Sequence, residues 1–134
     1  MKPLIILIVL AFLVSSCTNE EKPDEPATVP ISRETELKES IKKYPDSLSL
    51  KEYLIQYYRS NNNYDMALAT ANEVLQKDSS LARFWEMKAT LYFENYDTVN
   101  AIKAYEKLLD IYPAPQYVME LGSLYAATKI LKHY

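Results

Sequence analysis

The chain has 134 residues, a formal net charge of −3 and 49% hydrophobic residues. Its one cysteine excludes an internal disulfide, its one glycine excludes a glycine-rich phosphate loop, and its one histidine, His133, leaves no metal cluster and no nucleophile–histidine pair. For the same reason we assign no catalytic residue, no metal site and no enzymatic activity. Residues 31–134 hold 14 acidic and 13 basic side chains without a basic stripe, so we expect no nucleic acid partner.

The N-terminal stretch has the pattern of a signal peptide over residues 1–16. Lys2 precedes an apolar run from Leu4 to Val14. Eleven helical residues extend about 16 Å, whereas the hydrocarbon core of a bilayer is roughly 30 Å thick. The run is therefore too short for a comfortable transmembrane span, and it predicts a segment that is removed from the mature protein.

Cys17 directly follows this segment, at the end of the sequence VSSC in residues 14–17. These residues resemble the bacterial lipobox, in which the cysteine is lipidated and becomes the new N-terminus. The resemblance implies diacylglycerol and acyl chains, such as palmitate, on Cys17, and more than one chain suffices for lasting membrane attachment. The alternative is a conventional secretory signal that leaves Cys17 as an idle thiol.

Residues 17–31 are predicted to form a flexible tether. They include four acidic residues and three prolines but almost nothing apolar, so they cannot contribute to a core. Thr18 stands where an aspartate would favour retention in the inner membrane, and Glu20 and Glu21 resemble the surface-export signal of Bacteroidetes lipoproteins. These resemblances imply a lipid anchor in the outer membrane, on its periplasmic side or at the surface. The alternative is that the acids only keep the linker extended and soluble.

Residues 32–47 are predicted to form an N-terminal capping helix. Ser32 is a suitable N-cap, and the Tyr-Pro pair at 44–45 ends the helix. Its apolar positions lie one turn apart, at Leu37 and Ile41. The paragraphs below describe a repeated unit of two helices. In that register this helix takes the position of the second helix of a unit, and we expect no first helix before it.

Residues 48–81 are predicted to form a pair of helices. Ser49 and Glu52 read as a capping box that begins the first helix, and the asparagine run at 61–63 ends it. We expect the buried side of this helix to hold Leu50, Tyr53, Leu54, Tyr57 and Tyr58. The second helix starts near Asp65. Its apolar positions recur at helical spacing, at Ala67, Ala71, Val74 and Leu75.

Residues 82–114 repeat the same pattern, 34 positions later. A helix from about Leu81 to Glu94 is predicted to bury Phe84, Trp85, Ala89 and Tyr92. A turn at 95–97 then leads to a second helix, which Pro113 ends. That helix is predicted to bury Ala101, Tyr105, Leu108 and Leu109. Residues 115–134 open a third unit, of which only the first helix fits into the printed sequence.

The repeated residues resemble the tetratricopeptide repeat, whose pattern is W-x2-L-G-x2-Y, then A-x3-F, then P. The second unit fits best, at Trp85, Ala89, Tyr92, Ala101, Tyr105 and Pro113, although Lys88 stands where leucine is usual. The first unit departs from the pattern at Lys51, Ile55 and Ser79. The third unit fits at Leu121, Gly122 and Tyr125. The resemblance implies an all-α fold, a short α-solenoid of antiparallel helix pairs, and the alternative is a plain helical bundle whose register is fortuitous.

The last predicted helix has one apolar face without a covering helix. That face comprises Val118, Leu121, Tyr125, Ile130 and Leu131. We expect it to dock a partner, to pair with a second copy through Val118, Leu121 and Tyr125, or to belong to a longer chain.

Members of this family usually hold extended peptides on the groove-facing side of the first helices. By the repeat register, the corresponding residues here are Glu52, Gln56, Arg59, Arg83, Glu86, Thr90, Phe93, Met119 and Ser123. The lysine and asparagine set that grips a C-terminal carboxylate in chaperone-binding members is missing, so we do not predict that ligand. The alternative is that these residues form an ordinary solvated surface.

The resemblance implies a membrane-anchored scaffold or adaptor that binds proteins or peptides of the bacterial cell envelope. The alternative is a structural subunit of an envelope assembly or secretion complex, held through its open C-terminal helix face. Neither function needs a cofactor beyond the acyl chains on Cys17.

Overall fold

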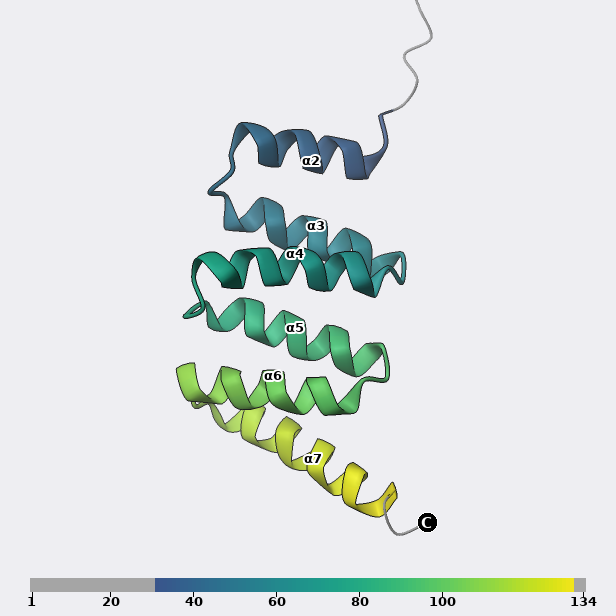
Figure 1. The fold of residues 1–134 in the computed structure, drawn as a ribbon, viewed down its shortest axis with the longest axis vertical. Helices are drawn as coiled ribbons and strands as arrows, with labels where there is room; N and C mark the ends of the chain where they lie inside the picture. The colour runs from purple at the N-terminus through teal and green to yellow at the C-terminus, as the bar shows by residue number, and fades with distance from the viewer. Residues whose placement is uncertain (1–30, 132–134) are drawn as a thin grey trace, which may run out of the picture. The chain divides into compact units, whose positions relative to one another are not determined.

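The computed structural model describes residues 31–131, and over that range the chain is all-helical, as the sequence predicts. The helices are α2 (Arg33–Lys43), α3 (Leu48–Ser60), α4 (Tyr64–Lys77), α5 (Ala82–Glu94), α6 (Thr98–Ile111) and α7 (Pro115–Leu131). Each helix packs against the next one in the chain, so that they form a stack in sequence order (Figure 1). The predicted signal peptide and Cys17 lie outside the described residues, as do the side chains of Ile130 and Leu131.

Several helices begin at side chains that cap them. Ser32 caps α2 by accepting a hydrogen bond from the backbone N–H of Thr35. Asn63 caps α4 and Asp97 caps α6 in the same way, and these two residues occupy the same position in successive repeats. Each cap satisfies one of the backbone N–H groups that a helix start leaves without a partner. The local sequence therefore fixes where the second helix of each repeat starts.

The predicted capping box at the start of α3 is wrong. The helix begins at Leu48 and its N-cap is Ser47, whose Oγ accepts from the backbone N–H of Leu50 at 3.4 Å. Glu52, the other half of the predicted box, instead pairs with Arg83 of α5. A contact between two repeats therefore takes the carboxylate that the local pattern assigned to the cap.

The buried side of α3 is also rotated from the predicted one. Leu54 and Tyr58 are buried as expected, but Leu50 and Tyr57 are only half-buried and Tyr53 is exposed. The other buried positions of α3 are Lys51 and Ile55. Ile55 occupies the repeat position of Ala89 and is buried like it, and the long stem of Lys51 allows its apolar part to be buried. The face that contacts α4 is therefore the one that the repeat register assigns, with a lysine stem in the usual place of tryptophan.

The two turns inside the repeats have the same backbone conformation. Asn62 has φ 55°, and Tyr96, at the same position of the next repeat, has φ 60°. Asparagine tolerates this left-handed region, whereas tyrosine does not favour it. The periodicity therefore extends to the backbone of the turns, where Tyr96 is held in a conformation that its side chain disfavours.

The core consists of two clusters that meet at α5. The first extends from α2 to α5 and includes Phe84 and Leu91, and the second extends from α5 to α7 and includes Ala89, Ala101 and Leu108. Every predicted core residue of α4 is buried. In the second repeat Trp85, Tyr92 and Leu109 are only half-buried, and the prediction missed Met87, Leu91 and Ala104. Within residues 31–131 the buried side chains, from Leu37 to Leu124, pack against one another, so we expect this unit to fold by itself.

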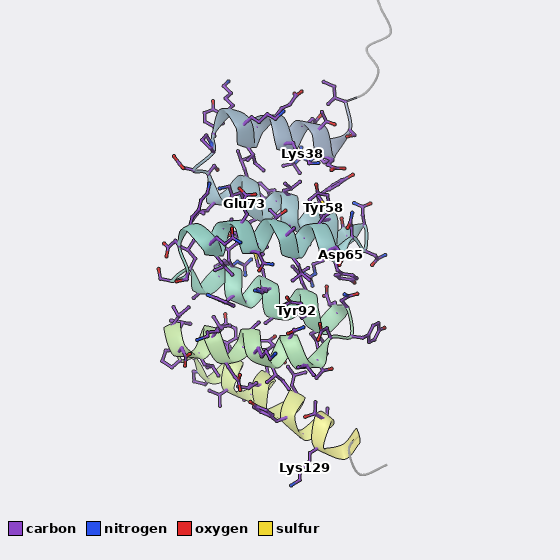
Figure 2. The ribbon with its side chains drawn as sticks, in the orientation of Figure 1. Lys38, Tyr58, Asp65, Glu73, Tyr92 and Lys129 are labelled. Carbon is purple, nitrogen blue, oxygen red and sulfur yellow. The ribbon has the colours of Figure 1, made fainter. Side chains whose placement is uncertain are left out.

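A polar contact joins α2 to α3 at the N-terminal end of the stack. The buried Tyr58 donates its hydroxyl to Glu34 Oε1 at 2.8 Å, and Lys38 Nζ lies 2.6 Å from the same carboxylate oxygen. Figure 2 marks Lys38 and Tyr58 on these two helices. The hydrogen bond from Lys38 is the main cause of the lowered pKa of Glu34, and burial is the main cause of the raised pKa of Tyr58.

The last helix, α7, packs on the rest through one face only. Leu124 is buried, and Tyr117 and Leu121 are half-buried against the second core cluster. The placement of Leu121 on the open face was therefore wrong, because this side chain points into the core. Val118 and Tyr125 are exposed, as predicted.

Candidate interaction groove

A groove lies between α3 and α5, the first helices of the two repeats. It encloses a hollow of about 240 Å³. The residues that line it are Ile55, Gln56, Arg59, Arg83, Glu86, Met87, Thr90 and Leu91. These residues come from corresponding turns of two helices that have the same place in their repeats.

The floor of the groove is apolar. Ile55 of α3 and Met87 and Leu91 of α5 are all buried members of the first core cluster. Each of these three side chains is at most 5% exposed, so the surface that a ligand meets is mainly that of the polar walls. The walls are Gln56 and Thr90, and the Thr90 hydroxyl donates to the backbone carbonyl of Glu86 at 3.0 Å.

One end of the groove is closed by a two-pronged ion pair between α3 and α5. Arg59 Nε donates to Glu94 Oε2 at 2.7 Å, and Arg59 Nη2 donates to the other carboxylate oxygen. The hydrogen bonds from Arg59 lower the pKa of Glu94, and the pKa of Arg59 is raised in turn. Such bidentate geometry fixes direction as well as distance, so it sets the spacing of the two helices at this end.

The opposite end is closed by Arg83. Its Nη1 donates to Glu86 Oε2 at 2.9 Å, and its Nε lies 3.5 Å from Glu52 Oε2 of α3. The hydrogen bond to Glu86 is the main cause of the raised pKa of Arg83. Both arginines of the groove therefore have carboxylate partners, and a ligand meets paired charges there.

The structure brings most of the predicted groove residues together. Gln56, Arg59, Arg83, Glu86 and Thr90 line the hollow, and Glu52 reaches it through Arg83. The other three predicted residues, Phe93, Met119 and Ser123, are exposed and lie outside the lining. Sequence reasoning missed Glu94, because its partner Arg59 lies in the preceding repeat and no local pattern marks the pair.

A second hollow of about 200 Å³ lies between α5 and α6, inside the second repeat. Three lysines surround it, Lys88, Lys103 and Lys107, together with the aromatic side chains of Trp85 and Tyr92. Lys88 Nζ lies 4.9 Å from the centre of the Trp85 ring, and burial lowers the pKa of this lysine. Lys88, which replaces the usual leucine, therefore covers the aromatic residues with its stem, as the sequence suggests for a residue of this length.

Two other kinds of site are absent from the part of the chain that the structure describes. Residues 31–131 hold no group of three or more side chains suited to a metal ion. Over the same residues no helix is both long and apolar enough to cross a membrane.

The comparisons with known proteins agree with this geometry. The sequence profile of the tetratricopeptide repeat family matches residues 54–114, which include most of α3, all of α4, α5 and α6, and the groove between α3 and α5. The solution structure of protein BPP2914 from Bordetella parapertussis is similar with a TM-score of 0.62 and 20% sequence identity, over 78% of this chain and 96% of that one. At this identity the likeness shows the fold alone. No curated protein matches the sequence. Residues 54–114 are therefore tetratricopeptide repeats, with α2 and α7 packed at the two ends of the matched stack.

Proposed function

We propose that this protein is a lipid-anchored scaffold of the bacterial cell envelope, and that its groove between α3 and α5 binds an extended segment of a partner protein. Tetratricopeptide repeats generally act as protein–protein interaction modules, and the repeats are therefore the basis of the scaffold function. The observation that supports this site most directly is the hollow itself, which is lined by predicted groove residues and lies between two ion pairs that join α3 to α5.

The size of the groove favours a peptide over a small molecule. Small-molecule sites usually enclose about 300–1,000 Å³, whereas this hollow holds about 240 Å³. An extended peptide needs room for only one or two side chains at such a point, while its backbone continues across the helices. The Gln56 amide nitrogen on the wall can donate to that backbone, whereas its oxygen already accepts from Arg59 Nη1 at 3.3 Å.

The paired charges indicate which peptides the groove favours. A strongly charged side chain would have to displace Arg59 or Arg83 from a carboxylate, which costs an existing hydrogen bond. An uncharged side chain needs no such exchange, and it meets the polar walls at Gln56 and Thr90. We therefore expect the bound segment to place an uncharged side chain in the hollow.

A matched pair of threonine variants tests the groove. Thr90 lines the hollow. Thr70 of α4 is also half-buried and makes the same hydrogen bond to the carbonyl four residues earlier, but it lies outside the lining. Thr90→Arg is expected to lower the capture of crosslinked partners from membranes by at least about tenfold, while Thr70→Arg retains it. Equal capture by the two variants would rule out the groove as the binding site.

The lipid anchor is proposed from the sequence, through the resemblance of residues 14–17 to a lipobox. Labelling cells with radioactive palmitate tests it. We expect label on the wild-type protein and none on Cys17→Ser, and the variant should leave the membrane fraction because a protein without acyl chains loses its attachment. Label that persists in Cys17→Ser would contradict the anchor without affecting the groove.

The exposed face of α7 supports a second candidate function, that of a subunit held in a complex through its last helix. Val118, Met119 and Tyr125 are all exposed on this helix. The two functions differ in what a crosslinking experiment from membranes recovers. One partner in a fixed ratio supports the subunit, whereas several partners in small amounts support the scaffold.

A further inference from the structure

The exposed face of α7 consists of the same repeat positions that are packed against a second helix in α3 and α5. In α5, Trp85, Ala89 and Tyr92 face α6, the second helix of their repeat. The same positions of the repeat pattern in α7 are Val118, Gly122 and Tyr125. In α3 they are Lys51, Ile55 and Tyr58, and all three are buried.

The burial of these positions differs sharply between the helices. Ile55 and Ala89, at the centre of the set, have 0% exposure. On α7, Val118 is 56% exposed and Tyr125 is 47% exposed. A Cβ atom added to Gly122 would meet no atom within 4 Å. Within residues 31–131, α7 therefore presents the face that binds a second helix. No described helix covers Val118 or Gly122, and Tyr125, at the edge of the face, donates its hydroxyl to Glu106 of α6.

The composition of α7 indicates that this face is not made for water. Among its 17 residues only Glu120 and Lys129 are charged. A helix that is apolar on nearly all sides is normally buried on nearly all sides. Here the face containing Tyr117, Leu121 and Leu124 packs on the core and the opposite side is open.

The helices that cover α3 and α5 show which kind of element fits the open face of α7. In each pair the covering helix runs back along the first helix after a short turn. At the same position of the repeat both covering helices have a fully buried alanine, Ala67 in α4 and Ala101 in α6; four residues later α4 has the fully buried Ala71, whereas α6 has Tyr105. The element that fits α7 is therefore an antiparallel helix with a small residue at this position, and α4 shows that a second one can follow four positions later.

We propose that this element is α7 of a second copy, so that two copies pair through an antiparallel α7–α7 contact. Gly122 and Ala126 lie four positions apart on the open side of α7, with the spacing of Ala67 and Ala71. An antiparallel contact of a helix with itself has twofold symmetry, so each α7 acts as the covering helix of the other. This inference deepens the second candidate function by naming its partner, and the groove does not depend on it.

The other end of a second copy fits less well. By the repeat register α2 is also a second-type helix, but its Arg33 stands where α4 has Ala67. Stacking α2 of one copy on α7 of another would bring an arginine side chain against Gly122, where the contact needs a small residue. The polar face of α2 therefore disfavours a head-to-tail polymer and leaves the symmetric pair.

Gly122 allows a test that leaves the single copy intact. Because the space around Gly122 is open, Gly122→Gln introduces no clash within one chain, and it removes a glycine from a helix interior. The new side chain would, however, hold two α7 helices apart. Ser123→Gln is the matched control, since Ser123 is exposed but lies outside the set formed by Val118, Gly122 and Tyr125.

The experiment is sedimentation velocity of the chain from Thr18 onward, measured over a range of concentrations. We expect a monomer–dimer equilibrium whose dissociation constant rises at least about tenfold in Gly122→Gln and stays within about twofold of wild type in Ser123→Gln. Circular dichroism should show equal helicity in all three proteins. A wild-type chain that remains monomeric up to about 1 mM, or open-ended polymers, would overturn the proposal. Because the groove test uses Thr90, failure of the dimer leaves the groove proposal standing.

Discussion

The ion pair between Arg59 and Glu94 gives the sharpest test of how the repeats are held together. It joins α3 to α5 by two hydrogen bonds, one of them 2.7 Å long. The two side chains are 37% and 29% exposed, so water screens their attraction in part. Exposed pairs contribute about 0.2–1 kcal/mol, and the bidentate geometry places this pair near the upper end, at about 1 kcal/mol.

A double-mutant cycle isolates this contribution. We would measure urea unfolding of the wild type, Arg59→Gln, Glu94→Gln and the double variant, and obtain a coupling free energy of about 1 kcal/mol at pH 7. Arg59 lowers the pKa of Glu94 in the folded state, so the stabilisation is present above the unfolded pKa of the carboxyl and is lost as the pH falls through the lower folded value. Coupling that persists unchanged when Glu94 is protonated, or that is zero at pH 7, would refute this reasoning.

Three further substitutions have expected outcomes in thermal unfolding. Tyr96→Asn should stabilise the protein by about 1 kcal/mol and raise Tm by about 4–8 °C, because Tyr96 has a positive φ that tyrosine disfavours and its side chain is 94% exposed. Asn62→Tyr, at the same position of the first repeat, should have the opposite effect. A loss of stability in Tyr96→Asn would show that the backbone at Tyr96 is not strained. Tyr58→Phe should cost about 1–2 kcal/mol by removing the hydrogen bond to Glu34, and an unchanged Tm would show that this contact does not hold α2 in place. Lys88→Leu should raise the free energy of unfolding by about 1 kcal/mol at pH 7. Burial lowers the pKa of Lys88 in the folded state, so this increase should shrink as the pH rises through the lowered folded pKa towards the ordinary lysine value of 10.5. An increase that does not depend on pH would come from packing alone.

The repeat period predicted the fold well because it reflects contacts that recur in every unit. The register places the start of α3 at Leu48, one repeat period before Ala82, and both helices begin at these residues. The local capping rule applied to Ser49 placed the start of α3 incorrectly. The repeat period, which relates residues 48–81 to 82–114, thus predicted the start of α3 better than the local capping motif, because either Ser47 or Ser49 could act as the N-cap.

Sequence reasoning failed where contacts between repeats decide the outcome. Tyr53 was expected on the buried side of its helix, yet it is exposed, while Lys51 is buried. Glu94 gave no signal because its partner is in another repeat. The groove residues of α3 and α5 could be named from the register, but the ion pairs that close the groove depend on side-chain directions that only the structure shows.

The most direct test of the proposed scaffold function is site-specific photocrosslinking in living cells. A photoreactive side chain at Gln56 would lie in the groove, and one at Glu73, an exposed position on α4 marked in Figure 2, would lie outside its lining. The account predicts crosslinks to partner proteins from Gln56 and few or none from Glu73. Equal crosslinking from both positions, or none from Gln56, would contradict it.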